Sequence, residues 1–237
     1  MKKVLFLLFI ILINACTIQG QMKSISFLTD DQVNIVGNYW QGGKNAVLLL
    51  HMMPATKESW EYFAEDLHKE NFTVLAIDLR GHGESMEQEG GILNYKTFTD
   101  EEHQDSIKDV EAAVDYLKEQ GAENIAIIGA SIGANLALEY QSEHPEIKKA
   151  VLLSAGTNYR GIEILPYAAK LREDQQVYFV AGSLDGRSAG SADAMAKEIA
   201  QKIKKKEIKI YNSTAHGTDL FAEDDTLSKI LIDWLKN

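Results

Sequence analysis

A serine stands between an apolar run and a helical run in Ile125-Ala126-Ile127-Ile128-Gly129-Ala130-Ser131-Ile132-Gly133. Residues 125–128 are typical of a short strand buried on both faces. Residues 134–140 contain good helix formers, with Pro145 beyond their end. Glycines on both sides of Ser131 permit a sharp strand-to-helix turn that lifts a serine hydroxyl out of a sheet. These features predict a nucleophilic serine on that turn, and the N–H of Ile132 would point toward the same reacting centre. The alternative is an ordinary loop serine.

Strand and helix signals alternate outward from this turn. Two runs that flank Thr29-Asp30-Asp31-Gln32 are typical of a hairpin, at residues 25–28 and 33–39. Further runs predict strands at 46–50, 72–77, 150–154, 177–181 and 207–211, and helices at 59–69, 107–117, 192–204 and 226–235. This order predicts an α/β fold with a mostly parallel sheet and helices on both faces. Functional side chains are then expected on loops at the carboxyl ends of strands.

Composition limits the classes of partner. The chain has 237 residues and a formal net charge of −11, which argues against nucleic acid and anionic lipid surfaces as partners. No cluster of His, Cys and Asp has the spacing of metal ligands, so neither a metal nor a cofactor is expected. No repeat or linker divides residues 21–237, which we assign to one domain.

The first twenty residues have the pattern of an export signal. Lys2 and Lys3 precede ten apolar residues at 4–13, and this run is too short to span a bilayer. Cys16, the only cysteine in the chain, occupies a place that resembles a bacterial lipobox, in which the cysteine is lipidated. The alternative is ordinary cleavage after Gly20. We therefore expect an exported protein of the cell envelope, anchored to the membrane through Cys16 or otherwise periplasmic or secreted.

A base and an acid for the serine follow it in the sequence. His216 lies just after the last predicted strand, where a general base could meet Ser131. The acid that orients such a histidine usually comes from a loop between the serine and the histidine. Asp185, after the strand at 177–181, fits best, and Glu163 is the alternative. Ser131, Asp185 and His216 together predict a catalytic triad.

Five short motifs resemble those of the α/β-hydrolase family, and the resemblance covers about residues 24–235. They are His51-Met52-Met53-Pro54, Asp78-Leu79-Arg80-Gly81-His82-Gly83-Glu84-Ser85, residues 129–133, Gly182-Ser183-Leu184-Asp185 and Ala215-His216-Gly217. The resemblance implies that the N–H of Met53, with Met52 as the alternative, joins Ile132 in binding the oxyanion. It also implies a structural role for the loop at 78–85. Met52 departs from the family pattern, because glycine is usual after the histidine.

The predicted substrate is a small neutral ester. Only 22 residues, 155–176, connect two neighbouring strands, which leaves no room for a large cap, so we expect an open site. Met52, Tyr159 and Ile162 are predicted to touch the substrate, with packing in the core as the alternative for each. We expect a serine hydrolase that cleaves carboxylic esters through an acyl-enzyme. A thioesterase, an amidase or peptidase, a cofactor-free perhydrolase and a non-catalytic binding lipoprotein are the alternatives, and the oligomeric state is open.

Overall fold

The computed structural model describes residues 21–186, 197, 201 and 203–237. The export segment predicted at 1–20, with Cys16, lies outside these residues, as does most of the helix predicted at 192–204. Within the described ranges, no helix is long and apolar enough to cross a membrane.

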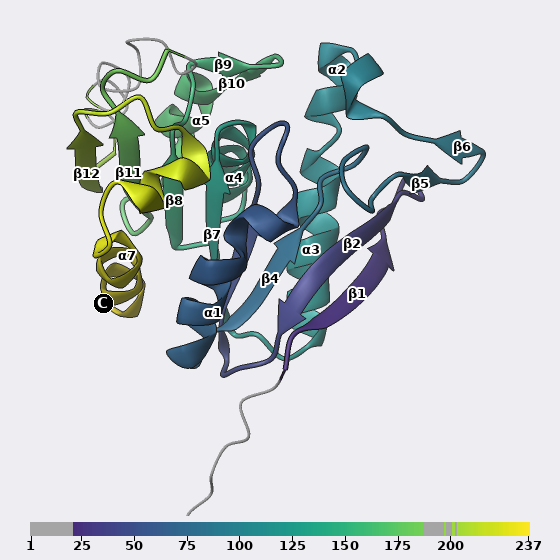
Figure 1. The fold of residues 1–237 in the computed structure, drawn as a ribbon, viewed down its shortest axis with the longest axis horizontal. Helices are drawn as coiled ribbons and strands as arrows, with labels where there is room; N and C mark the ends of the chain where they lie inside the picture. The colour runs from purple at the N-terminus through teal and green to yellow at the C-terminus, as the bar shows by residue number, and fades with distance from the viewer. Residues whose placement is uncertain (1–20, 187–196, 198–200, 202) are drawn as a thin grey trace, which may run out of the picture.

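A single eight-stranded sheet organises the described part of the chain (Figure 1). Its strands lie in the order β1-β2-β4-β3-β7-β8-β11-β12. Strand β2 is antiparallel to β1 and β4, and every later pair is parallel. The predicted hairpin and parallel sheet are therefore confirmed. The strands span Lys23–Leu28 (β1), Asn34–Trp40 (β2), Asn45–Leu50 (β3), Thr73–Ile77 (β4), Asn124–Ala130 (β7), Lys149–Leu153 (β8), Gln176–Gly182 (β11) and Lys205–Tyr211 (β12).

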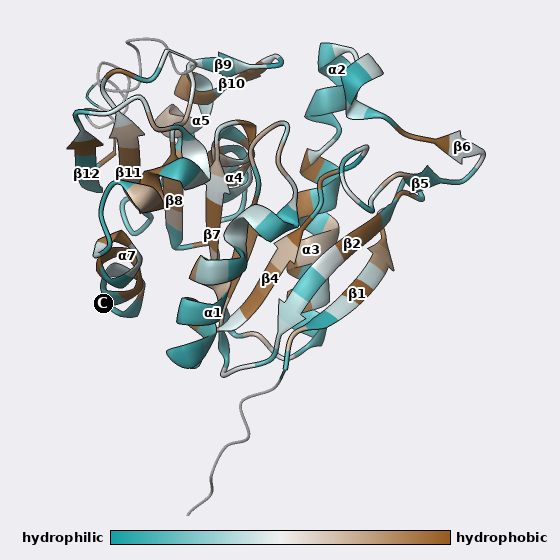
Figure 2. Ribbon diagram, in the orientation of Figure 1, coloured by the Kyte–Doolittle hydropathy of each residue, from teal (hydrophilic) through white to brown (hydrophobic). Residues whose placement is uncertain are grey.

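Helices cover both faces of this sheet. Successive side chains of a strand point to opposite faces, and β3 follows the rule: Leu48 and Leu50 join one core, whereas Val47 and Leu49 join the other. The apolar colour in Figure 2 accordingly gathers on strands such as β4 and β7, and the outer helix α1 is largely hydrophilic. The first core is closed by α3 (Ile107–Glu119), α4 (Ile132–Glu143) and α5 (Ile164–Lys170), and the second by α1 (Glu61–Lys69) and α7 (Leu227–Lys236).

Short elements that the sequence did not predict gather near the carboxyl ends of the parallel strands. Helix α2 (Asp100–Gln104) and the hairpin of β9 (Asn158–Tyr159) and β10 (Ile162–Glu163) lie at the same end of the molecule (Figure 1). They touch, because Nε2 of Gln104 donates a hydrogen bond of 3.3 Å to the carbonyl oxygen of Arg160. The remaining short elements are η1 (Lys57–Trp60), β5 (Glu87–Gln88), β6 (Gly91–Ile92), η2 (Tyr95–Thr97) and η3 (Gly217–Ala222).

Candidate active site

Ser131 occupies a strained turn between β7 and α4. Its φ is 54° and its ψ is −118°, a conformation that residues with a Cβ rarely adopt. The flanking glycines are required because backbones meet there. A Cβ on Gly129 would lie 2.0 Å from the carbonyl oxygen of Gly133, and a Cβ on Gly133 would lie 2.5 Å from that of Leu50. The turn is further fixed by the N–H of Ser131, which donates to the carbonyl oxygen of Leu153 at 2.8 Å.

Asp185 and His216 form a buried pair on neighbouring loops. Nδ1 of His216 lies 2.5 Å from Oδ2 of Asp185, and the two residues are 2% and 1% exposed. The loops are held together by their backbones, since the N–H of Leu184 donates to the carbonyl oxygen of Ser213 at 3.0 Å. Gly182 makes this approach possible: a Cβ there would lie 2.5 Å from the same oxygen. Glu163, the alternative acid, lies in β10 with an exposed side chain, so the carboxylate at His216 is that of Asp185.

The loop that carries His216 rests against the turn that carries Ser131. Gly217 has a φ of 58°, and a Cβ on it would lie 3.2 Å from Cβ of Ala130, the residue before Ser131. The N–H of Gly217 donates to Oγ of Ser154 at 2.9 Å. Ser154 is fully buried at the end of β8 and itself has a φ of 52°. The structure thus brings Ser131, His216 and Asp185 to one edge of the sheet.

His51 orients the loop predicted to bind the oxyanion. The N–H of Leu79 donates to Nε2 of His51 at 3.0 Å, so Nδ1 must carry the ring proton, and it donates to the carbonyl oxygen of Met52 at 2.9 Å. Complete burial lowers the pKa of His51 to about 4, which keeps the ring neutral. The Met52–Met53 peptide is trans, and the N–H of a trans peptide points opposite to its C=O. The N–H of Met53 therefore points away from His51. Its role as an oxyanion donor, like that of Ile132, stays a prediction.

The side chain of Met52 packs against the loop that carries His216. The side chain is 8% exposed, and its Sδ would lie 2.5 Å from a Cβ on Gly217. The thioether therefore packs directly on the glycine that follows His216. Among the other predicted substrate contacts, Tyr159 is half-buried and donates to the carbonyl oxygen of Ser154 at 3.3 Å, and Ile162 is buried in the first core. Contact of these three residues with a substrate stays a prediction.

Sequence reasoning missed Ser154 and Asn135. Asn135 lies four residues after Ser131 on α4 and is fully buried. Its amide donates to the carbonyl oxygens of Gly156 and Ile162 at 2.9 Å each and accepts from the N–H of Gly156 at 3.1 Å. These bonds attach Gly156, before β9, and Ile162, in β10, to the helix that follows Ser131. One signal was available, because Asn135 is a polar residue between the apolar residues Ala134 and Leu136.

The loop at 78–85 braces the neighbouring strand end, as the family resemblance implies. Asp78 is fully buried and accepts hydrogen bonds from the N–H and Nζ of Lys57 and from the N–H of Glu84. Burial alone would lower the pKa of Lys57, but the hydrogen bonds to Asp78 and Glu84 outweigh it and raise that pKa. His82 is also buried and stacks on the ring of Tyr95 with centroids 3.8 Å apart.

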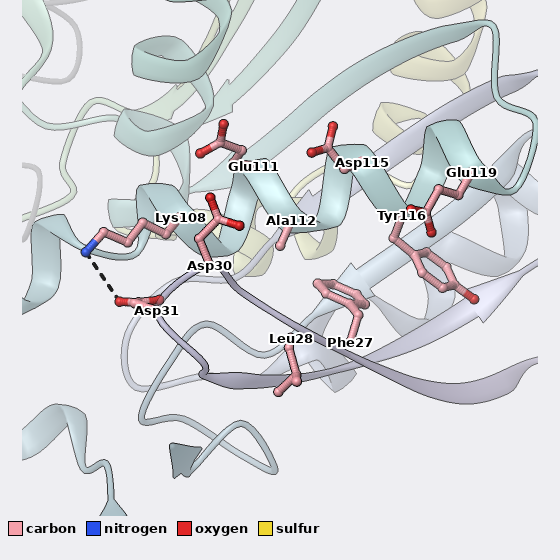
Figure 3. A pocket seen from close by; sticks show the side chains of 10 residues that line it. All are labelled: Phe27, Leu28, Asp30, Asp31, Lys108, Glu111, Ala112, Asp115, Tyr116 and Glu119. Carbon is pink, nitrogen blue, oxygen red and sulfur yellow. Dashed lines mark hydrogen bonds and ion pairs between the residues drawn. The ribbon is translucent and has the colours of Figure 1, made fainter. Parts of the chain in front are cut away.

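Two grooves on the described surface bear on the site. The first, called here the Met52 groove, has a volume of about 730 Å³ and runs between α1 and the residues around η3; it is lined by Met52, Ala55, Ser59, Tyr62, Phe63, Asp66, Thr218, Asp219, Phe221, Ala222, Asp224, Asp225 and Ser228. The second, called the acidic groove, has about 570 Å³ and lies between β1 and α3. Figure 3 shows the carboxylates of the acidic groove on the turn after β1 and along α3. Strand β1 is at one edge of the sheet, and β2, β4 and β3 lie between it and β7. This second groove is therefore remote from Ser131.

The comparisons with known proteins agree with the fold that the structure shows. A model of the alpha/beta hydrolase fold matches residues 45–204. A bifunctional esterase/perhydrolase of Acinetobacter calcoaceticus is 34% identical over 131 residues, which are 54% of this chain and 43% of that protein. A probable alcohol acetyltransferase of Cyberlindnera fabianii is 30% identical over 105 residues, 44% of this chain and 25% of that protein. The chain thus spans less than half the length of these relatives. The solved structure of a Pyrococcus furiosus esterase superposes with a TM-score of 0.75 at 21% identity, covering 91% of this chain and 92% of that one.

Proposed function

Because the chain belongs to the α/β-hydrolase family, we propose that it is a serine hydrolase that cleaves small carboxylic esters. The observation that carries this proposal is the buried His216–Asp185 pair, which lies beside the strained turn of Ser131. A serine hydroxyl becomes nucleophilic when a positioned base takes its proton. The buried carboxylate of Asp185 supplies the partner that fixes the tautomer of such a base.

The proposed reaction runs through an acyl-enzyme. Oγ of Ser131 attacks the ester carbonyl while Nε2 of His216 takes the hydroxyl proton, and Asp185 stabilises the resulting imidazolium. The negative carbonyl oxygen accepts hydrogen bonds from the N–H groups of Ile132 and Met53. Losing one such donor typically costs about 2.7–4 kcal/mol of transition-state stabilisation. His216 then gives its proton to the departing alkoxide oxygen. Water, deprotonated by His216, attacks the acyl-enzyme and releases the carboxylic acid.

A fluorophosphonate probe tests the nucleophile directly. Such a probe forms a covalent bond with an activated serine, so the wild-type protein should be labelled and the Ser131→Ala variant should not. Ser154→Ala provides a matched comparison, because Ser154 is also a buried serine with a positive φ; this variant should still be labelled, although more slowly, since Ser154 holds the loop of His216. Labelling that persists in Ser131→Ala and disappears in Ser154→Ala would reject the assignment.

Hydrogen peroxide is a second candidate acceptor of the acyl group. The relative from Acinetobacter calcoaceticus is named as both an esterase and a perhydrolase, and both reactions share one acyl-enzyme. Peroxide that attacks the acyl carbonyl would release a peracid and regenerate Ser131. Peracid measured after addition of peroxide and an acetate ester, absent in Ser131→Ala, would support this activity. Formation of acetic acid alone would limit the protein to hydrolysis.

A further inference from the structure

The Met52 groove begins at the two loops that the proposed reaction uses. Met52 precedes the predicted oxyanion donor Met53, and its Sδ packs on Gly217, which follows His216. Thr218, Asp219 and Phe221, also on the segment after His216, line the groove farther along. We call the part of the groove at Met52, which touches the loop of His216, its inner end; other lining residues belong to α1 and to the start of α7.

The position beside His216 decides which part of a substrate this groove would meet. In the proposed mechanism His216 must protonate the oxygen of the departing alcohol. That oxygen must consequently come within hydrogen-bond distance of the histidine, and we expect the group attached to it to reach the segment that follows His216. The acyl group is attached to the carbonyl carbon and leaves the reacting centre in another direction.

The walls of the groove are aromatic and aliphatic. The rings of Phe63 and Phe221 lie with centroids 4.8 Å apart, and the side chain of Tyr62 stands at the rim, 87% exposed. A volume of about 730 Å³ is in the range of sites for small organic molecules, which are mostly apolar with a few polar groups. Such walls suit an aromatic or branched aliphatic group.

The rim of the groove carries only negative formal charges. Asp66, Asp219, Asp224 and Asp225 line it, and none of its lining residues is lysine, arginine or histidine. Asp66 lies 3.0 Å from Nζ of Lys69 and Asp224 lies 2.9 Å from Nζ of Lys209, and both lysines are outside the lining. A negatively charged group would meet no countercharge among the lining residues of the groove, so a group without a negative charge is favoured.

We propose that the Met52 groove is the binding site for the alcohol part of the ester, and that this part is an aromatic or bulky aliphatic group without a negative charge. The inference rests on the proposed ester hydrolysis. Met52 forms its inner end, so the departure from the usual glycine shapes the site for the leaving group. Aromatic rings at the rim supply contact area at low conformational cost.

Two esters with the same acyl group separate the groove from the catalytic centre. The alcohol part of 1-naphthyl acetate is bulky and aromatic, whereas that of methyl acetate is a single methyl group on the oxygen. Ala55→Trp fills the groove, and Tyr62→Ala removes an exposed ring without disturbing the core. The ratio of kcat/KM for 1-naphthyl acetate to that for methyl acetate should fall at least tenfold in Ala55→Trp and about threefold in Tyr62→Ala. Ala112→Trp, the same substitution in the acidic groove, should leave the ratio within twofold of wild type.

Binding of 1-naphthol, the alcohol product, gives a readout that needs no turnover. Titration calorimetry with the Ser131→Ala protein should detect 1-naphthol, and the additional change Ala55→Trp should weaken its Kd at least fivefold. An unchanged Kd together with an unchanged ester ratio would overturn the groove assignment. Absence of Ser131-dependent turnover of either ester would instead reject the proposed hydrolysis, and the calorimetry would still decide whether the groove binds an aromatic alcohol.

Discussion

The Met52 groove and the acidic groove are similar in volume, about 730 and 570 Å³, yet they are built from different parts of the fold. The Met52 groove ends at loops that leave the carboxyl edge of the sheet and packs its walls against the second core. The acidic groove lies along the side of the sheet, where Phe27 of β1 stacks on Tyr116 of α3 with ring centroids 5.3 Å apart. Two grooves of similar size therefore differ in the chemistry they can serve, because only the Met52 groove is lined by loops beside His216.

The charged side chains of the two regions differ in burial and in pairing. At the catalytic edge, Asp185 and His216 are buried and paired. In the acidic groove, Asp30, Glu111, Asp115 and Glu119 are exposed, and Lys108 reaches Asp31 at 3.3 Å (Figure 3). Ion pairs at exposed sites contribute little, typically about 0–1 kcal/mol. Equivalent substitutions in the two regions should therefore have very different effects.

The strongest test of this difference replaces one carboxylate by an amide in each region. Asp185→Asn should lower kcat for ester hydrolysis about 10⁴-fold, because the amide would favour the wrong tautomer of His216. Asp115→Asn, in the acidic groove, should leave kcat within twofold of wild type. Steady-state kinetics with 1-naphthyl acetate measures both. A comparable loss in the two variants would remove the distinction between the regions.

Acid should destabilise the catalytic edge through His51. Its pKa is lowered from 6.5 to about 4 by burial, so at pH 5 the unfolded chain holds a proton on this ring and the folded chain does not. Unfolding then takes up protons, and stability falls as the pH drops from 6.5 toward 4. The contribution between pH 7 and pH 5 is about 2 kcal/mol.

Urea unfolding at both pH values, for wild type and His51→Asn, measures this contribution. The variant should lose about 2 kcal/mol less than wild type between pH 7 and pH 5, although it starts from lower stability. Subtracting the loss of stability in the variant from that in wild type cancels the contributions of the other titrating groups. Equal losses would show that His51 is not the responsible group.

A smaller effect is expected from the serine that holds the histidine loop. Ser154→Ala removes the oxygen that accepts the N–H of Gly217, and the loop would shift to restore a partner for that buried group. We expect kcat to fall about tenfold with little change in KM, since misplaced catalytic groups slow chemistry more than binding. Ser142→Ala is the control, because Oγ of Ser142 bonds only within its own helix, to Glu139. An unchanged kcat in Ser154→Ala would separate Ser154 from the positioning of His216.

The smallest effect on kcat belongs to the N-terminal segment. We propose that the protein is exported and tethered through a lipid on Cys16, as its first twenty residues predict. Cys16→Ser should leave kcat of the purified protein unchanged but move the protein out of the membrane fraction, or leave it as an unprocessed precursor. Soluble mature protein in equal amounts from both forms, beginning at Gln21, would replace the tether with simple secretion.

Sequence patterns predicted the parts of this fold that depend on local rules. The turn of Ser131 was predictable because only glycines satisfy the close backbone approaches at 129 and 133. The central strands β3, β4, β7 and β8 were predictable because burial on both faces demands continuous apolar runs. The pairing of β9 with β10 was not, since two-residue strands carry no periodicity.

Contacts between distant segments set the rest of the site, and no local pattern encodes them. Met52 could be recognised from the sequence as a departure from the family pattern, but the packing of its sulfur on Gly217 could not. Likewise, the bonds from Asn135 to Gly156 and Ile162 join residues more than twenty positions apart. The Met52 groove itself arises from the approach of α1 to the segment around η3, which depends on packing across the whole second core.

The backbone stack around Ser131 has a consequence for how this protein would lose activity. Gly129, Gly133 and the carbonyl group of Leu50 meet without intervening side chains, and the N–H of Ser131 is bonded to β8. Amides enclosed in this way exchange with solvent only when the sheet itself opens. The amide of Ser131 should therefore rank among the slowest to exchange deuterium, and denaturant should abolish catalysis in the same transition that melts the central strands, with no earlier loss at the nucleophile.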